Sequence, residues 1–228
     1  FYIYEQRADI LYKFGIDADY AEDPADDYWA REILNGGYIL HFRHAERDKW
    51  IDVQMYDALE SDLHTNGIDE SRYAENEYFD QAVCLNERGK IQAKAMGEHI
   101  QHIGLPISTV VSSVSCRGRQ TADLAFGGYD SQHRLLVHEG PYNETDADRI
   151  HILKEFYGSL PVTSDSNVIV SAHNGVVKKE MFENVDSTDP SLNLEEGGFY
   201  IISQRNGKLY LEHEFHNFAS FMKIFYDR

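Results

Sequence analysis

The sequence predicts an α/β protein, in which a mostly parallel central sheet forms the middle of a three-layer sandwich with helices on both faces. Apolar, β-rich segments alternate with helical segments along most of the 228 residues. Strands that are separated by helices usually pair in parallel, and such a sheet is covered on both faces. With 42% hydrophobic residues, the chain can fill one substantial core.

The first three elements are expected to be a strand, a helix and a strand. Residues 38–42 (YILHF) form an apolar, β-rich run. Asn86 is a suitable N-cap for a helix at 86–103, and Gly104 ends it. Five residues of this helix recur at spacings of three and four and share one face: Gly89, Ala93, Met96, Ile100 and Ile103. Residues 107–113 (ISTVVSS) form the next strand.

The alternation continues to a C-terminal hairpin. The expected elements are a helix at 119–126, a strand at 134–138, a helix at 146–157, a strand at 167–172 and a helix at 175–183. The segments GFYIIS and KLYLEHEF then flank Asn206 and Gly207. Asn-Gly between two β-rich segments is a strong hairpin signal, so antiparallel pairing is expected at the end of the sheet.

The formal net charge of −18 makes nucleic acid and anionic membrane surfaces poor partners, because both select basic faces. No run of apolar residues approaches the roughly 18 that a membrane span needs. Most of the negative charge lies in two stretches: residues 1–35 hold nine acidic and three basic residues, and residues 48–80 hold ten and two. The rest is nearly balanced, which leaves room for a local cationic site.

These charges suggest the domain organisation. Residues 1–35 are expected to be an acidic extension that packs on a main domain at 36–228, with an acidic insertion at about 48–80. The insertion is either a solvated loop or a cap that selects substrates. Because the chain begins at Phe1, removal of a signal peptide or a lipid anchor is kept as an alternative. A periplasmic or exported location is slightly favoured over a cytoplasmic one. The oligomeric state is left open.

Cysteine and histidine positions give little sign of a metal site. Cys84 and Cys116 lack metal-ligand spacing, and two buried thiols are expected, with a single disulfide as the alternative. Two histidine pairs have a spacing that suits a shared helical face: His99 with His102, and His213 with His216. The second pair lies in a predicted strand, however, where residues i and i+3 point to opposite faces. We expect neither a metal nor a cofactor.

Three charged groups follow predicted strands. Residues 43–47 (RHAER) follow the first, residues 112–122 (SSVSCRGRQTA) the second and residues 172–175 (AHNG) the fourth. The carboxyl ends of parallel strands meet at one edge of a sheet, which is where open α/β proteins bind ligands. Guanidinium groups offer a fork of donors that suits phosphate oxygens. The sequence therefore predicts a phosphate site at this edge.

Together the motifs resemble those of the histidine phosphatase superfamily, which includes the cofactor-dependent phosphoglycerate mutases. Arg-His-x-Glu-Arg after a strand, LNERGKIQAKAMG, SSxxxRxRQTA and a strand ending in His-x-Gly follow the superfamily's order over roughly residues 36–203. GGYILHFRHAER is most similar to a subgroup of small bacterial phosphatases, here called RHAER-type. The resemblance implies a phosphoglycerate mutase-like fold and a histidine acid phosphatase-type enzyme. Such an enzyme hydrolyses a phosphomonoester, here a small phosphorylated metabolite or glycan, through a phosphohistidine.

The resemblance also implies residue roles. His44 would be the nucleophile, because a neutral imidazole can attack phosphorus and its ordinary pKa is about 6.5. Arg43, Arg47 and Arg117 would bind the phosphoryl group and stabilise the charge that builds on its oxygens. His173 would be a further donor to that group and belongs with the catalytic residues.

Two assignments keep alternatives. Arg117 and Arg119 lie two apart at a helix start and face different directions, and the resemblance favours Arg117 for the phosphate. Expelling an alkoxide requires a proton donor, for which Glu139 is favoured over Asp48 and Glu144.

Two other functions are weighed against hydrolysis. A mutase-type phosphotransferase is disfavoured, because the mutases carry Gly-Glu-Ser where this chain has Ala45-Glu46-Arg47. A non-catalytic module that only recognises phosphate is disfavoured by the presence of both histidines and three arginines.

Overall fold

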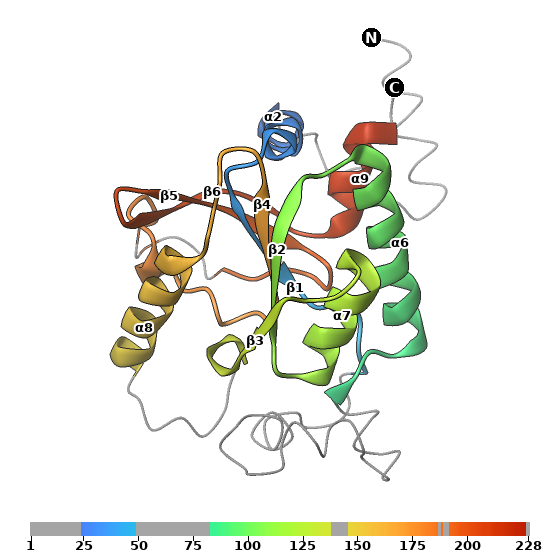
Figure 1. The fold of residues 1–228 in the computed structure, drawn as a ribbon, viewed down its shortest axis with the longest axis horizontal. Coiled ribbons are helices and arrows are strands. Elements are labelled where there is room, and N and C mark those ends of the chain that lie inside the picture. The colour runs from blue at the N-terminus through green and yellow to red at the C-terminus, as the bar shows by residue number, and fades with distance from the viewer. Residues whose placement is uncertain (1–23, 49–82, 138–145, 187, 189–191, 227–228) are drawn as a thin grey trace.

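A six-stranded mixed sheet forms the centre of the molecule (Figure 1). The computed structural model describes residues 24–48, 83–137, 146–186, 188 and 192–226. The strands, in their order across the sheet, are β3 (Ser131–His133), β2 (Ile107–Ser113), β4 (Asn167–Ala172), β1 (Ile39–Arg43), β5 (Phe199–Arg205) and β6 (Lys208–Phe215). The predicted sheet with parallel strands and a final antiparallel hairpin is confirmed.

The pairing of the strands decides what meets at each edge. β1 runs parallel to β4, β4 to β2 and β2 to β3, so these four strands end at one edge, called the rim below. β5 is antiparallel to β1, and Phe42 pairs with Phe199. The residues just before β5 therefore lie at the same rim as the residues just after β1.

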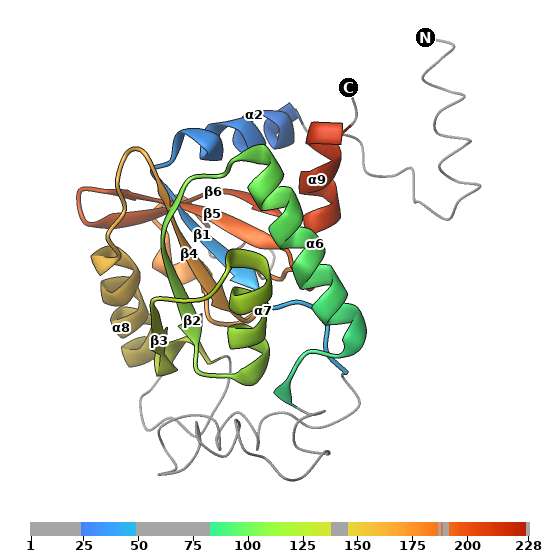
Figure 2. The same cartoon turned by 45° about the vertical axis from the view of Figure 1, so that its right-hand side comes forward.

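Helices cover both faces of the sheet (Figure 2). One face carries α2 (Pro24–Glu32), α6 (Glu87–Ile103), α7 (Cys116–Phe126) and α9 (Phe218–Tyr226). The other carries α8 (Asp146–Ser159) and the short helices η2 (Arg134–Leu136) and η3 (Lys179–Met181). Leu40 and Phe42 of β1 pack toward the first set, and Ile39 packs toward the second. This alternation follows from the two-residue period of a strand.

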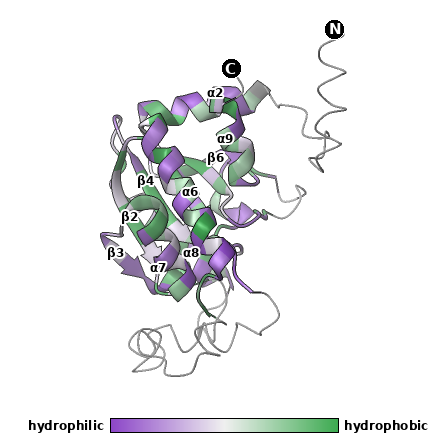
Figure 3. Ribbon diagram, turned by 90° about the vertical axis from the view of Figure 1, so that its right-hand side faces the viewer, coloured by the Kyte–Doolittle hydropathy of each residue, from purple (hydrophilic) through white to green (hydrophobic). Residues whose placement is uncertain are grey.

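Helix α6 has the caps that its sequence predicts, whereas α7 begins at a cap that was not expected. In α6, the Asn86 side chain accepts a hydrogen bond from the Gly89 amide at 2.8 Å, and Gly104 closes the helix at φ 67°. α7 begins at Cys116, earlier than expected, because Ser115 caps it. Figure 3 shows hydrophobic and hydrophilic residues interleaved along both helices, as expected where one helical face packs on a sheet.

The predicted strand at 134–138 is wrong. The strand in this region is β3, three residues earlier, and Arg134–Leu136 form the 3-10 helix η2. The His133 side chain accepts a hydrogen bond from the Leu135 amide and turns the chain out of the sheet. A short apolar run fits a strand and a buried turn equally well.

The predicted helix at 175–183 is also wrong, since only η3 forms there. Gly175 has φ 78°, which stops a right-handed helix from starting, and Lys178 is extended. Val176 and Val177 are buried against the sheet, where β-branched side chains pack well.

The described residues before β1 pack on the main sheet. Ala30 of α2 and the neighbouring Ile33 lie in the same apolar cluster as Leu40. The division at residue 35 stays a prediction, as does the role of the insertion at about 48–80. Residues 1–23, 49–82 and 138–145, which include Glu139 and Glu144, lie outside the described residues. Among the described residues, none of the helices combines the length and apolar character that spanning a bilayer requires.

Candidate active site

The two histidines expected to be catalytic lie side by side at the rim. His44 follows β1 and His173 follows β4, and their ring centroids are 5.1 Å apart. The His44 amide donates to the Ala172 carbonyl at 3.0 Å, which extends the β1–β4 pairing into the rim. Only 4% of His44 and 2% of His173 is exposed. The sheet thus brings together residues that are 129 positions apart in the chain.

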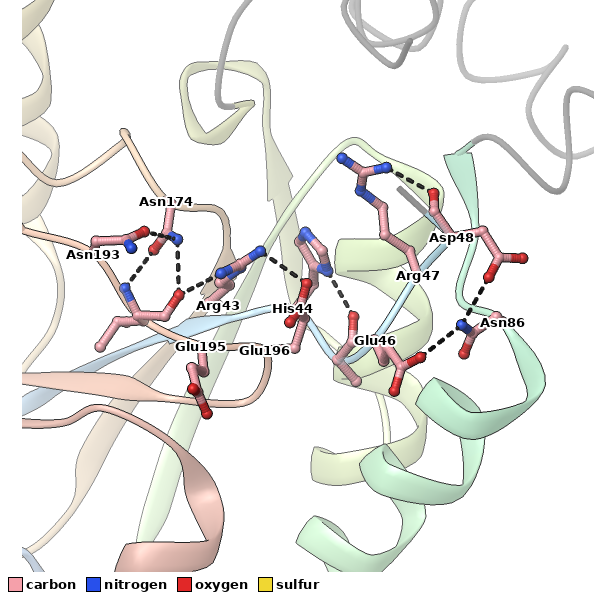
Figure 4. A network of polar contacts seen from close by, with 12 residues as sticks. Arg43, His44, Glu46, Arg47, Asp48, Asn86, Asn174, Asn193, Glu195 and Glu196 are labelled. Carbon is pink, nitrogen blue, oxygen red and sulfur yellow. Dashed lines mark hydrogen bonds and ion pairs between the residues drawn. The ribbon is translucent and has the colours of Figure 1, made fainter. Parts of the chain in front are cut away.

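The His44 ring is held as a neutral imidazole. Its Nδ1 lies 2.7 Å from the Ala45 carbonyl oxygen, which can only accept, so Nδ1 carries the proton and Nε2 carries the lone pair (Figure 4). Burial lowers the pKa of His44 well below its ordinary value, and the charges of Arg117, Arg43 and Arg47 lower it further. The hydrogen bond to Ala45 acts in the opposite direction without reversing the shift. This arrangement suits a nucleophile.

Arg117 and Arg119 have different surroundings at the start of α7. Arg117 is in the first turn of α7, is only 2% exposed, and its charge acts on both His44 and Arg43. Arg119 turns back and donates from Nη1 to the Val114 carbonyl. The choice of Arg117 for the phosphate, which the resemblance favoured, stays a prediction.

The other two arginines lie on opposite sides of His44 in Figure 4. Arg43 contacts the residues before β5: its Nη1 donates to the Leu194 carbonyl and its Nη2 lies 2.9 Å from Glu196 Oε1. Arg47 donates from Nη1 to the backbone carbonyl of Asp48 at 2.8 Å.

His173 is fixed by hydroxyl groups from the β2–α7 connection. Its Nε2 lies 2.9 Å from Ser113 Oγ and 3.1 Å from Ser115 Oγ. Gly118 permits this approach, because a Cβ there would lie 2.3 Å from Ser113 Oγ. The motifs gave Ser113 no role, so only the structure shows this contact.

His41 forms a hydrogen bond with the backbone of His173. It is fully buried, as expected of a core-facing residue, and its Nε2 donates to the His173 carbonyl at 3.3 Å. A carbonyl only accepts, so Nδ1 of His41 accepts from the Tyr157 hydroxyl of α8 at 2.6 Å. Burial lowers the pKa of His41 to about 4, so its ring is neutral in these two hydrogen bonds.

The loop after β1 is held in place by backbone and side-chain contacts with the two helices. The Ala45 amide donates to Thr121 Oγ1 at 3.0 Å, and the Glu46 amide donates to Gln92 Oε1 at 2.9 Å. Asn86 Nδ2 donates to Glu46 Oε1 at 3.0 Å and to Asp48 Oδ1 at 3.1 Å (Figure 4). Glu46 therefore anchors the loop to α6, and Asp48 shares in that anchor.

The expectation of two buried thiols is wrong, because Cys84 and Cys116 form a disulfide. Cys84 lies three positions before the start of α6, Cys116 is the first residue of α7, and their Cα atoms are 4.8 Å apart. The disulfide joins the segment that enters α6 to the turn that carries Arg117. Arg117 Nη1 also lies 3.5 Å from the Val83 carbonyl of that segment.

The histidines weighed as metal ligands have other surroundings. His99 is enclosed by the rings of Phe218, Phe221 and Phe225, and His213 lies 2.7 Å from an Asp26 oxygen. Within the described part of the chain, no three His, Cys, Asp or Glu side chains are grouped as a metal site would require.

Glu196 contacts Arg43 but lies outside the sequence motifs that predicted the site. It precedes β5, and the antiparallel pairing of β5 with β1 brings it to Arg43. In the sequence, the signal for Glu196 was the predicted hairpin. A strand that is antiparallel to β1 begins at the rim, so the residues just before it lie near the residues that follow β1.

Comparisons with known proteins bear on the fold. No protein-family model matches the chain, and no curated protein matches it in sequence. A structure of the protein histidine phosphatase SixA complexed with tungstate is 11% identical, with a TM-score of 0.51 over 78% of this chain and 95% of that chain. A phosphoglycerate mutase from Bacillus anthracis is 13% identical, with a TM-score of 0.45 over 84% and 98%. An open reading frame product from Mycobacterium tuberculosis is 18% identical, with a TM-score of 0.47 over 78% and 99%. This chain therefore has the fold of the protein histidine phosphatase SixA, and its central sheet with helices on both faces confirms the α/β class that its sequence predicts.

Proposed function

We propose that the protein is a phosphomonoester hydrolase that forms a phosphohistidine on His44. The observation that supports this most directly is the neutral His44 ring, whose Nδ1 is engaged by the Ala45 carbonyl while Nε2 keeps its lone pair. A buried, oriented imidazole beside several arginines is suited to attack on a phosphoryl group.

The reaction then has two displacements at phosphorus. In the first, Nε2 of His44 attacks, the bond from phosphorus to the ester oxygen breaks, and the leaving oxygen takes a proton from a general acid. In the second, water attacks the phosphohistidine and loses a proton to the same group, which releases inorganic phosphate and free His44. Arg43, Arg47, Arg117 and His173 stabilise the charge on the non-bridging oxygens in both steps.

Glu139 is proposed as the general acid, with Asp48 and Glu144 as alternatives. Asp48 accepts a hydrogen bond from Asn86 that helps to hold the loop after β1 against α6. This contact favours a structural role for Asp48. The proposed substrate is a small phosphorylated metabolite or glycan, because the acidic chain disfavours polyanions. The RHAER-type subgroup is the proposed place of the chain within the superfamily.

Hydrolysis of 4-nitrophenyl phosphate tests the proposal. We expect turnover by the wild type and a loss of at least about a thousandfold in His44→Ala, since that variant lacks the nucleophile. His151→Ala is the matched control, because His151 is exposed on α8. Quenching with an alkaline denaturant during turnover of a ³²P-labelled phosphomonoester should trap a phosphohistidine, which is stable in base and labile in acid, in the wild type and His151→Ala but not in His44→Ala.

Three outcomes would contradict the proposal in different ways. Substantial turnover by folded His44→Ala would remove His44 as the nucleophile. Binding of vanadate by the wild type without turnover would favour the phosphate-recognition module. Transfer of the label to a second acceptor in preference to water would favour a mutase-type phosphotransferase.

A further inference from the structure

One short segment contacts both loops that carry the histidines. Residues 193–198, called the clip below, come between β4 and β5 and reach the rim because β5 is antiparallel to β1. The Leu194 amide donates to Asn174 Oδ1 at 2.9 Å, and the Leu194 carbonyl accepts from Asn174 Nδ2 at 2.8 Å. Asn174 directly follows His173, so the clip holds the second catalytic loop.

The clip holds the first catalytic loop as well. The Gly197 amide lies 3.2 Å from the carbonyl oxygens of both Arg43 and His44, and the Arg43 amide donates to the Gly198 carbonyl at 2.9 Å. The Arg43 guanidinium donates to the Leu194 carbonyl and to Glu196 Oε1 (Figure 4). A carboxylate from the clip is thus paired with an arginine expected to bind phosphate.

The pair of Arg43 and Glu196 is sheltered from water. Their side chains are 17% and 15% exposed, and the two atoms of the pair lie 2.9 Å apart. Burial lowers the pKa of Arg43, and the charges of Glu196 and, to a smaller extent, Glu195 oppose that shift. An ion pair in such surroundings is costly to break by removing one partner, because the remaining charge stays partly buried.

The contacts also fix the direction of the guanidinium. This group is planar and has five N–H donors in a rigid fork. Hydrogen bonds from both Nη atoms to the clip set its plane and leave its other donors for a ligand. Small errors in the placement of a group that stabilises a transition state cost rate, up to about a hundredfold for 1 Å.

We infer that Glu196 is a positioning residue, which orients Arg43 for the phosphoryl group without itself touching the substrate. The inference rests on the proposed function and extends it to a residue outside the motifs. The competing interpretation is that Glu196 occupies Arg43 at the expense of the substrate, in which case its removal would strengthen anion binding.

Glu196→Gln tests the inference, because it keeps the shape of the side chain and removes its charge. We expect kcat/KM for 4-nitrophenyl phosphate to fall roughly 10- to 100-fold, mainly through kcat, in protein that stays folded at the assay temperature although its midpoint of thermal unfolding falls. The dissociation constant of vanadate should rise in parallel, since vanadate mimics the transition state.

Glu195→Gln is the matched control for loss of one negative charge in the clip. The Glu195 side chain is 56% exposed, lies 3.9 Å from His216 and points away from Arg43 in Figure 4. Its kcat/KM should stay within about twofold of wild type, because an exposed charge is screened by solvent. An equal loss in both variants would show a general charge effect and overturn the inference.

A double-mutant cycle with Arg43→Ala separates positioning from support of the fold. If Glu196 acts through Arg43, then Glu196→Gln should cause no further loss of kcat/KM in the Arg43→Ala background. Equal losses in both backgrounds, or tighter vanadate binding by Glu196→Gln, would overturn the inference.

The same variants distinguish its failure from failure of the proposed function. An active wild type with an unaffected Glu196→Gln overturns the inference alone. If the wild type binds vanadate without turnover, the hydrolase proposal fails, and the vanadate affinities of Glu196→Gln and Glu195→Gln then decide the inference.

Discussion

The Nδ1 atom of His44 lies 2.7 Å from the carbonyl oxygen of Ala45, the next residue in the chain. This contact assigns the ring proton to Nδ1, and burial together with three arginine charges keeps the ring from gaining a second proton. Because the pKa of His44 is lowered, its neutral form persists as the pH falls through 6.5.

Activity should therefore extend into acid. We predict that kcat/KM for 4-nitrophenyl phosphate falls on the acid side only well below pH 6.5. The values are first corrected for the titration of the substrate's own phosphate near pH 6. The measurement is a pH–rate profile from pH 4 to 8 with the fold monitored by circular dichroism. An acid limb at pH 6.5 or above in the folded enzyme would contradict a depressed pKa for His44.

The two arginines of α7 should separate by function. Arg117→Ala should lower kcat/KM by roughly 10²- to 10³-fold, because it removes a cation that acts directly on the His44 surroundings. Arg119→Ala removes the donor to the Val114 carbonyl, so it should lower the midpoint of thermal unfolding and change kcat/KM by only a few fold in folded protein. Steady-state kinetics and thermal melts of both variants check this, and a similar kinetic loss in each would refute the distinction.

The general acid can be identified by its dependence on the leaving group. Glu139→Gln should slow an alkyl phosphate by roughly two to four powers of ten and hardly affect 4-nitrophenyl phosphate, whose leaving group departs without a proton. Asp48→Asn should affect both substrates alike, because Asp48 helps to anchor the loop that carries His44. The opposite pattern, with Asp48→Asn selective for the alkyl ester, would reassign the role to Asp48.

Reduction of the disulfide should weaken the fold. Its two cysteines are 32 positions apart, and closing a loop of that length stabilises a protein by about 3–4 kcal/mol in the chain-entropy description. The double variant Cys84→Ser with Cys116→Ser should lose about that much free energy of unfolding in urea titrations. Maleimide labelling of denatured protein should find two thiols only after reduction, whereas labelling without reductant would show that the bond does not form.

The sequence by itself determined most of the elements and the edge of the sheet at which His44 and His173 meet. Caps, glycines and residue periodicity are local signals, which explains why α6, β4 and the β5–β6 hairpin form where they were expected. His44 and His173 each follow an apolar strand, and parallel strands end at one edge of a sheet. Proximity of the two histidines therefore followed from topology alone.

Only the tertiary structure decided the contacts that give these residues their chemistry. Glu196 is 153 positions from Arg43, and no local pattern records that antiparallel β5 brings them together. The bond between Cys84 and Cys116 likewise depends on how α6 and α7 pack beside each other. The choice between Arg117 and Arg119 depends on the turn at which α7 begins, which Ser115 sets. Periodicity and caps act over a few residues, whereas the direction of a side chain and its burial depend on the packing of distant segments.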